Sequence, residues 1–319
     1  MKAQLPLSWT HKDIEYPKFD SVNLHLSGVP WVYNAEIPSD YDLQSLCNDL
    51  ESKFNQGFLL RGCRTELAAY LSDKDFSIIR TGAEGVIDLQ CINGLPESVS
   101  NLVRRGEKFG DVGEIVLSET TRIKVSSFIK KTPYALKPKL KFLFNTSFDS
   151  STRCFVMSAS DSNWLGVITV SFSSSDSCHA EMILRDKSAP VGVMEFLLFS
   201  LMNIMKKEGY KKFSLGEVPF VTPPSMDCVN LDSSILRSLQ EILLFKSGHF
   251  LRYAFNYRGL FDFKNKFNPD WQPVYICTSS KAPTLCLVDL FYKTGYFELS
   301  RKELISNFMY SSTKEYPQI

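Results

Sequence analysis

The sequence predicts an α+β protein built from two lobes in tandem, each a mixed sheet flanked by helices. Its 319 residues are more than one hydrophobic core usually serves, so two units of roughly 150 residues each are expected. Residues 151–319 indicate an antiparallel meander, a long helix and a further strand, and residues 1–150 show a weaker version of the same mixture. We therefore predict domains at residues 1–150 and 151–319.

Composition and charge exclude several classes of function. Apolar residues make up 44% of the chain and charged residues 22%, as in ordinary globular proteins, and the formal net charge is only +1. Any binding of nucleic acid or anionic lipid must therefore come from local patches. The eight cysteines form no CxxC pair and the four histidines are scattered, so we expect no metal site.

Two features bear on the compartment. The first residues, MKAQLPLSWTHKDIEY, lack the apolar core of a signal peptide, and the cysteine usage suits reduced thiols. The most apolar run, Val191 to Met205, is interrupted by Glu195, Ser200 and Asn203 and is shorter than the roughly 18 residues typical of a spanning helix. We expect a cytoplasmic protein without a transmembrane segment.

The first lobe is expected to open with an irregular arm followed by two helices. Four prolines interrupt residues 1–38, which show no helical pattern. Ser39 or Asp40 is predicted to cap a helix that ends near residue 55, and a second helix is predicted from Thr65 to Leu71. The first helix is predicted from apolar residues at helical spacing, namely Leu43, Leu46, Cys47, Leu50 and Phe54.

Residues 76–117 predict a hairpin, a helix and a short strand. Segments 76–80 and 85–91 have strand composition, and Thr81-Gly82-Ala83-Glu84 between them has the composition of a turn. Pro96 and Glu97 then begin a helix that Gly110 ends, with Arg104 and Arg105 on its polar side. Residues 114–117 are predicted to form a strand.

A basic segment extends from Arg122 to Lys141. Its aromatic residues Phe128, Tyr134 and Phe142 could stack on bases while lysines hold the phosphates of an RNA strand. A solvated basic face is the alternative interpretation. The segment has no acidic residue, and its RNA-binding candidates are Lys130, Lys131, Lys137 and Lys139.

The second lobe has the clearer pattern. Strands are predicted at residues 153–157, 164–172 and 178–185, followed by a helix from Pro190 to Glu208 and a strand from Lys212 to Leu215. This order is similar to the core of the GCN5-related acyltransferase (GNAT) fold. The resemblance implies tandem GNAT-like lobes, although fold order alone does not give function.

The loop before the long helix differs from that of coenzyme A enzymes of this fold. Such enzymes need an Arg/Gln-x-x-Gly-x-Gly/Ala loop whose N–H groups hold the pyrophosphate. Residues 185–194 read RDKSAPVGVM instead, and Pro190 removes one N–H donor. We expect no tightly bound cofactor and an acyl donor other than coenzyme A.

Several segments resemble the C-terminal catalytic domain of phosphatidylglycerol lysyltransferases, the multiple-peptide-resistance family. They are APVGVMEFLL at residues 189–198, GYKKFSLGEVP at 209–219, GLFDFKNKFNPDWQPVY at 259–275 and, in the first half, RTGAEGVIDL at 80–89 with the basic helix that follows. The third segment is also similar, more distantly, to the Fem aminoacyltransferases of peptidoglycan synthesis. The resemblance implies transfer of an amino acid from aminoacyl-tRNA to a lipid.

This chain departs from the family pattern at one point. Phe261 and Asp262 stand where the lipid-modifying members usually carry two arginines. If those arginines hold an anionic lipid or a tRNA phosphate, this chain has a different acceptor or reduced activity. The sequence also shows no counterpart of the membrane-spanning half that brings the lipid-modifying members to their substrate, so we expect a soluble acceptor or a peripheral encounter with a membrane.

Attack on an aminoacyl ester needs a stabiliser for the oxyanion and a route for the proton. The resemblance favours Lys264 for the cationic role. Lys266 lies about 200° away on a helix, so it is expected to face solvent or a tRNA phosphate. Glu195 is expected at the rim of a cleft, where it could hold the α-amino group or only stabilise its helix. Glu217 could reach the same pocket or form a loop salt bridge.

Three further residues are candidates for binding substrate. Arg185 ends the strand before the long helix and could grip a phosphate or carboxylate, or pair with Asp186 or Glu181. Arg258 precedes the motif at residues 259–275. Trp271 is either core or a wall of the acceptor pocket.

The sequence thus predicts an aminoacyltransferase that uses aminoacyl-tRNA as donor and a phosphatidylglycerol-like lipid or a small molecule as acceptor. Two alternatives remain open. One is a coenzyme A-dependent N-acyltransferase of the same fold. The other is a tRNA-binding module that has lost turnover, which the Phe261–Asp262 pair suggests.

Overall fold

The computed structural model describes residues 4–91, 94–116, 118–135, 137–143, 152–160, 163–226, 235–251, 255–280 and 282–312. Its strands are β1 Thr10–Lys12, β2 Lys18–Asn23, β3 Pro30–Pro38, β4 Leu59–Cys63, β5 Ser77–Asp88, β6 Asp111–Ile115, β7 Arg153–Ser158, β8 Trp164–Ser174, β9 Ser177–Arg185, β10 Lys212–Pro219 and β11 Asp270–Thr278. Its helices are α1 Leu43–Lys53, α2 Thr65–Ser72, α3 Glu97–Glu107, α4 Glu119–Ile129, α5 Val193–Lys207, α6 Ile235–Leu251, α7 Tyr257–Asn265, α8 Pro283–Lys293 and α9 Tyr296–Ser312.

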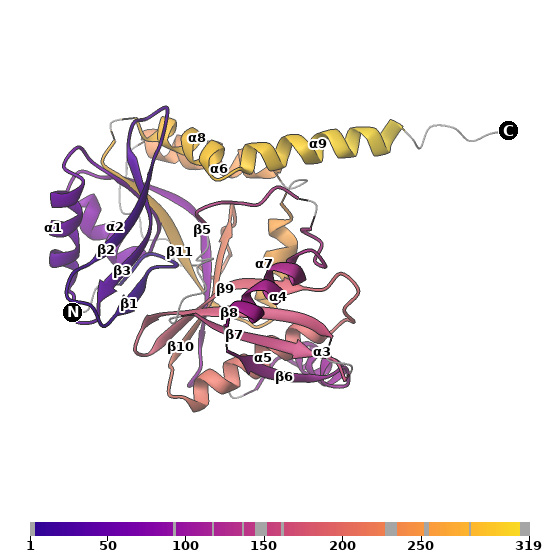
Figure 1. Cartoon of the computed structure of the whole chain (residues 1–319). Coiled ribbons are helices and arrows are strands. Elements are labelled where there is room, and N and C mark those ends of the chain that lie inside the picture. The colour runs from indigo at the N-terminus through magenta and orange to yellow at the C-terminus, as the bar shows by residue number, and fades with distance from the viewer. Residues whose placement is uncertain are drawn as a thin grey trace.

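The described strands form one 11-stranded sheet that runs through the molecule (Figure 1). The order is β1-β3-β4-β11-β5-β10-β9-β8-β7-β6, and β2 pairs with β3 at the edge. The long strand β5 lies at the centre, antiparallel to both β10 and β11. β6 belongs to the first half of the chain but pairs with β7, and β11 belongs to the second half but pairs with β4 and β5. The two halves therefore share one sheet.

Helices cover both faces of this sheet. Helices α3 and α5 pack against β7 to β10 through one apolar core that includes Val103, Leu197 and Phe213. Helices α1 and α2 pack against β3, β4 and β11 through a second core. Helices α8 and α6 lie with the start of α9 along the top edge in Figure 1, over a third core around Trp31 and Ile276. A smaller core seats α4 on β7 and β8.

The order predicted for the second half is confirmed. The meander of β7, β8 and β9, the helix α5 and the strand β10 all lie within a few residues of their predicted bounds. In the first half, α1, α2 and α3 also form where predicted, whereas β6 begins three residues before the predicted strand at 114–117. The cap of α1 is Asp42, whose side chain accepts a hydrogen bond from the Ser45 N–H, so the helix begins later than expected.

The prediction of an irregular N-terminal arm is wrong, because residues 1–38 contain β1, β2 and β3. Pro30 and Pro38 are the first and last residues of β3, where a missing N–H donor costs the sheet little. Two of the four prolines that suggested an irregular arm therefore mark the ends of a strand. The placing of a domain boundary at residue 150 stays a prediction.

The predicted hairpin at residues 76–91 is also wrong, because one continuous strand, β5, runs from Ser77 to Asp88 through the predicted turn. Gly82 and Gly85 are extended, outside the left-handed region that a tight turn would need. A Cβ on Gly82 would lie 2.2 Å from the carbonyl oxygen of Val218, and one on Gly85 would lie 3.2 Å from Pro269. These glycines allow neighbouring segments to pack closely against β5. In the sequence alone, their composition resembles that of a turn.

Among the residues described, no helix has the length and apolar character that crossing a membrane requires.

Candidate functional site

The candidate site lies where the sheet opens between β9 and β10. These parallel strands pair only at residues 212–214 of β10 and 177–179 of β9. Beyond Ser214, β10 continues along β5 with a shift in register before Glu217, and Gly216 at this irregularity has a φ of +81°. The opening leaves backbone carbonyls of β10 without a strand partner on the β9 side.

Lys264 fills this opening from α7. Its side chain is buried, and Nζ donates hydrogen bonds to the carbonyl oxygens of Gly216 and Glu217, at 3.0 and 3.1 Å. Burial lowers the pKa of Lys264 to about 7, although Glu217 and Glu84 oppose the shift. The lysine can therefore give up and take back a proton near neutral pH, as general acid–base chemistry requires.

Glu217 connects Lys264 to a small, partly open cavity. Its carbonyl accepts from Lys264, while its carboxylate forms an ion pair with Arg61 and accepts a hydrogen bond of 2.9 Å from the Thr81 hydroxyl. The three side chains form the polar end of a cavity of about 50 Å³, which is room for a few water-sized groups. Its other walls are largely apolar and come from α6, α8 and β11, with Tyr296 of α9 beside them.

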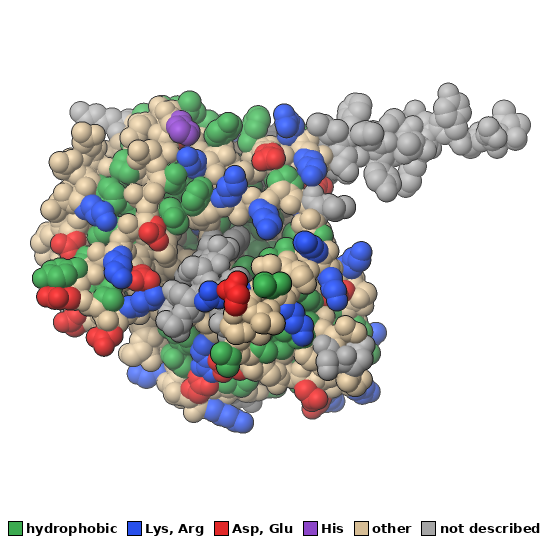
Figure 2. Space-filling model, in the orientation of Figure 1, with side chains coloured by type: hydrophobic (Ala, Val, Ile, Leu, Met, Phe, Trp, Pro, Cys, Tyr) green, Lys and Arg blue, Asp and Glu red, His purple; other side chains and the backbone are tan. Residues whose placement is uncertain are grey.

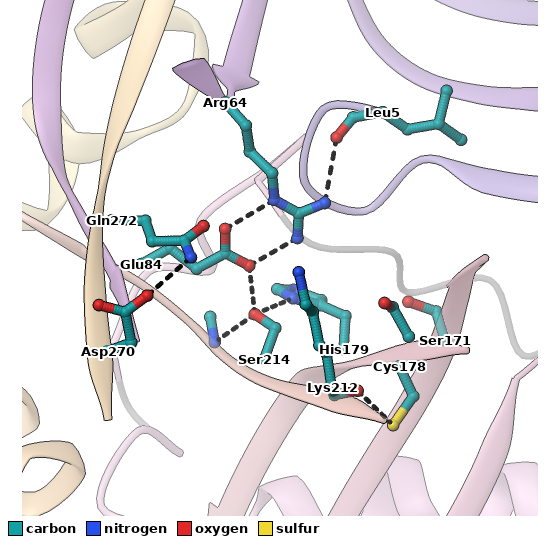
Figure 3. Close-up of polar contacts among 12 residues, drawn as sticks. Leu5, Arg64, Glu84, Ser171, Cys178, His179, Lys212, Ser214, Asp270 and Gln272 are labelled. Carbon is teal, nitrogen blue, oxygen red and sulfur yellow. Dashed lines mark hydrogen bonds and ion pairs between the residues drawn. The ribbon is translucent and has the colours of Figure 1, made fainter. Parts of the chain in front are cut away.

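Arg64 and Glu84 form a buried ion pair (Figure 3). Arg64 donates to both carboxylate oxygens of Glu84, with Nε–Oε2 at 2.7 Å and Nη2–Oε1 at 2.6 Å. Burial alone would raise the pKa of Glu84, but the Arg64 guanidinium outweighs it and the pKa is lowered. Glu84 therefore carries a negative charge within the core at neutral pH, and it contributes to the field at Lys264.

Ser214 links this ion pair to His179. The Ser214 hydroxyl donates to Glu84 Oε1 at 2.5 Å and lies 2.9 Å from His179 Nδ1, as Figure 3 shows. Burial lowers the pKa of His179, so the imidazole is neutral at pH 7. A Cβ on Gly216 would lie 3.4 Å from His179 Cε1 and 3.5 Å from Lys264 Nζ. The imidazole and the ammonium thus flank the backbone of one glycine.

The network ends at the N-terminal segment. Glu181, on β9 beside His179, accepts hydrogen bonds from Ser8 at 2.9 Å and from Ser171 at 2.6 Å. His179 Nε2 lies 4.0 Å from the same carboxylate. Residues that are distant in sequence therefore meet in one buried polar network around the split in the sheet.

Glu195 and Lys266 meet each other, apart from this network. Lys266 Nζ lies 2.9 Å from Glu195 Oε1, which joins the end of α7 to the first turn of α5. The Lys266 side chain is 41% exposed, in agreement with its expected position toward solvent, whereas Glu195 is buried. Arg185 is exposed and donates to the carbonyl of Ala189, so it braces the loop before α5. Their roles in catalysis or binding stay predictions.

Arg258 lines a second, more open cavity of about 340 Å³ between the start of α7 and the loop after β10. Trp271 is buried. Its Nε1 donates to Asn265 at 3.0 Å and its ring packs on Phe261, with centroids 5.0 Å apart. Phe261 and Asp262 also line the second cavity, whereas Trp271 supports its wall from behind.

The predicted RNA-binding lysines lie on and after α4. Figure 2 shows Lys and Arg side chains around α4 on the face that it displays. Lys130, Lys131 and Lys139 are exposed, whereas Lys137 is half-buried and forms an ion pair of 3.2 Å with Glu303 of α9. Three of the four candidates are therefore accessible, and RNA binding stays a prediction.

The N-terminus of α5 is covered by α3. A Cβ on Gly106 would lie 2.2 Å from the carbonyl oxygen of Gly192, the residue that caps α5. Gly192 has a φ of +101°, and its own Cβ would lie 2.4 Å from the Leu102 carbonyl. Helix α3 therefore packs tightly against the first turn of α5.

The sequence motifs pointed to Lys264 and Glu217 but not to Arg61, Arg64, Glu84 and His179. Glu84 and His179 lie within strands that are otherwise largely apolar, and such buried charges need partners. An ionisable residue inside a predicted core strand is the signal that could have found them. Arg64, the partner of Glu84, directly follows β4, and Arg61, the partner of Glu217, lies within it.

One family model matches the chain. Residues 142–278 match the family described as phosphatidylglycerol lysyltransferase, C-terminal. This segment contains α5, β10, α7 and β11, and with them Lys264 and Glu217. No curated protein sequence matches the chain. The resemblance that the sequence motifs indicated is confirmed, and the match supports the prediction that the protein is a transferase.

Solved structures share the fold over most of the chain. The structure of L-PGS from Bacillus licheniformis has 16% sequence identity and a TM-score of 0.66, and the match covers 88% of this chain and 86% of that one. A C-terminal domain of a lysylphosphatidylglycerol synthetase candidate from Agrobacterium fabrum has 17% identity and a TM-score of 0.64, with 86% and 84% covered. FemX has 9% identity and a TM-score of 0.54, with 85% of each chain covered. The predicted α+β fold class is confirmed.

Proposed function

We propose that this protein, with its match to the phosphatidylglycerol lysyltransferase C-terminal family, is an aminoacyltransferase. Its donor is aminoacyl-tRNA, and its acceptor is a hydroxyl or amine of a lipid or small molecule. The observation that carries the proposal is the position of Lys264 in the split between β9 and β10, inside the segment that matches the family. The similar folds of L-PGS and FemX support the same class of reaction.

In the proposed reaction, the acceptor nucleophile attacks the carbonyl carbon of the aminoacyl ester. The bond to the acceptor forms, the ester bond to the ribose breaks, and the ribose oxygen leaves with a proton. Lys264 can accept the proton of the nucleophile and return it to the leaving oxygen, because burial brings its pKa to about 7. Its charged form would also stabilise the oxyanion that develops during attack.

The packing of α3 against α5 favours this donor over coenzyme A. The backbones of Gly106 and Gly192 are in close contact at the start of α5, so a pyrophosphate could bind there only if α3 moved. Calorimetric titration with acetyl-CoA should therefore give no heat of binding. Binding at micromolar concentration would favour the rival N-acyltransferase.

The direct test uses tRNA charged with radiolabelled amino acids and a lipid or metabolite extract as the source of acceptor. Label should move from tRNA to a product, and Lys264→Ala should reduce the rate by at least about a hundredfold, as expected for loss of a general acid–base group. Lys207→Ala is the matched control, because Lys207 is an exposed lysine at the end of α5. Transfer at the normal rate by Lys264→Ala would refute the proposed site, and no transfer from any charged tRNA would refute the donor.

A further inference from the structure

The second cavity has the size and the lining of a binding site for a small molecule. Its volume of about 340 Å³ falls within the range of roughly 300–1,000 Å³ that ligand sites span. Its walls are mainly aromatic and proline side chains, and its charged groups are Arg258 and Asp262. The cavity is open and its lining is partly polar, so a small ligand would be held at the surface by both apolar contacts and charged groups.

The two charged residues are placed to act together. Arg258 and Asp262 are four residues apart on α7, so their Cβ atoms are about 5–6 Å apart on one side of the helix. Both are exposed. Within the part of the chain that the structure describes, neither side chain forms an ion pair with the other or a hydrogen bond to a third group. A guanidinium and a carboxylate at one cavity are therefore both available to a ligand.

The walls are fixed around this pair. Asn256 caps α7 by accepting a hydrogen bond of 2.9 Å from the Gly259 N–H, which holds the turn that carries Arg258. Phe220, on the opposite wall, has a φ of +61°, a conformation that costs a bulky residue energy and that is found most often at functional sites. The Phe220 ring packs edge-on against Tyr257 and also lines the smaller cavity at Glu217.

The cavity lies along the stripe of α7 that ends at the candidate catalytic lysine. Tyr257, Phe261 and Lys264 are spaced i, i+4 and i+7, which places them on one side of the helix. The distance along the axis from Tyr257 to Lys264 is about 10 Å. Lys264 itself is buried and does not line the cavity, so a molecule bound there would have to extend along α7 to meet it.

We propose that this cavity binds the acceptor and that the acceptor is zwitterionic, with a phosphate or carboxylate held by Arg258 and an ammonium held by Asp262. A guanidinium binds such an anion through two parallel hydrogen bonds, and a carboxylate beside aromatic rings suits an ammonium. That the bound molecule is the acceptor rests on the proposed function, whereas the binding of a zwitterion does not. A purely anionic molecule would meet Asp262 as a like charge.

Transfer to such an acceptor converts its ammonium group into an amide. The ammonium loses two protons, of which one goes to solvent and the other ends on the ribose hydroxyl of the tRNA. An amide bond forms between the acceptor nitrogen and the aminoacyl carbonyl, and the ester bond breaks. No oxidant or further reactant is needed.

Calorimetric titration of the full chain with three matched probes tests the site without any tRNA. Phosphoethanolamine carries both charges, glycerol 3-phosphate lacks the ammonium and ethanolamine lacks the phosphate. Phosphoethanolamine should bind at least about tenfold more tightly than either of the others, because each lost charged hydrogen bond is worth about 1.5–3 kcal/mol. Equal binding of the three probes, or no binding of phosphoethanolamine, would overturn the proposal.

Variants assign the binding to this cavity. Arg258→Ala and Asp262→Asn should each weaken phosphoethanolamine about tenfold or more, and Asp262→Arg should reverse the preference in favour of glycerol 3-phosphate. Glu107→Gln removes an exposed carboxylate at the end of α3 and should change nothing. Normal binding by Arg258→Ala and Asp262→Asn, both with an unchanged melting temperature, would place the ligand elsewhere and refute the inference.

Two further measurements complete the test. One distinguishes a lipid headgroup from a soluble molecule as the source of the zwitterion, and the other tests this inference independently of the proposed function. Phosphatidylcholine vesicles with and without phosphatidylethanolamine show whether the zwitterion is a lipid headgroup; binding only of free phosphoethanolamine identifies a soluble acceptor. Binding of phosphoethanolamine without transfer from any charged tRNA would support the binding site and refute the proposed function. Transfer that neither Arg258→Ala nor Asp262→Asn slows would keep the function and refute this site.

Discussion

Lys264 donates a hydrogen bond of 3.1 Å to the carbonyl oxygen of Glu217, and this contact joins α7 to the irregular part of β10. The carboxylate of the same glutamate faces Arg61 and the small cavity that both residues line. One backbone unit therefore separates a buried ammonium from a buried ion pair. Substitutions at either side should affect the other through the position of β10.

The buried ammonium makes stability depend on pH. Lys264 has a pKa of about 7 in the folded protein, whereas an unfolded lysine has a pKa of roughly 10.4. Between these values the unfolded chain binds a proton that the folded chain does not. The free energy of unfolding should therefore rise with pH from about 7 to 10, by at most about 1.4 kcal/mol per pH unit from this group.

Urea unfolding at half-unit steps of pH, compared with Lys264→Met, measures this contribution. The wild type should gain stability relative to the variant as pH rises, because methionine has no proton to release. Lys207→Met, at an exposed site, should follow the wild-type curve. A constant difference between wild type and Lys264→Met across this range would show that Lys264 stays charged when folded.

Removing one partner of the Arg64–Glu84 pair should destabilise the protein more than removing both partners. Arg64→Met would leave the Glu84 carboxylate buried without its main partner, so the free energy of unfolding should fall by about 3–5 kcal/mol. The double variant Arg64→Met with Glu84→Leu should recover much of this loss, because no unpaired charge remains. Urea unfolding at pH 7 of both variants and of Glu84→Leu completes the double-mutant cycle. Additive losses would indicate that the two side chains do not interact.

Part of the fold and of the candidate site could be predicted from the sequence, and part could not. The second half was predicted well because α5 and its strands carry a regular apolar pattern, such as Leu197 and Leu201 one turn apart. Strand β5 was misjudged because Gly82 serves close packing against Val218, a contact that no local pattern contains. Arg64 and Glu84 were missed because their pairing depends on how β4 and β5 lie on either side of β11. Lys264 was found through motif resemblance, and its pKa follows only from its burial.

The basic segment makes a prediction about tRNA. Lys130→Ala with Lys131→Ala removes two exposed charges after α4, so the affinity for tRNA should fall and its dependence on salt should become less steep by about two contacts. Fluorescence anisotropy with labelled tRNA at several salt concentrations measures both. Lys18→Ala with Lys207→Ala removes the same charge from other surfaces and is the control. An equal loss in both double variants would indicate that only net charge matters.

Gly106→Ala tests the contact between α3 and α5 through the sign of its effect. In the interior of an exposed helix, alanine in place of glycine stabilises by about 1 kcal/mol. Here the new Cβ would lie 2.2 Å from the Gly192 carbonyl oxygen and 2.7 Å from Phe196 Cβ, so the helices must separate or the backbone must shift. We expect the melting temperature to fall by several degrees, since overpacking costs about 1–3 kcal/mol. Gly113→Ala is the control, because no heavy atom lies within 4 Å of its Cβ position. A higher melting temperature for Gly106→Ala would mean that α3 lies farther from the start of α5. A pyrophosphate could then bind at that helix end without movement of α3.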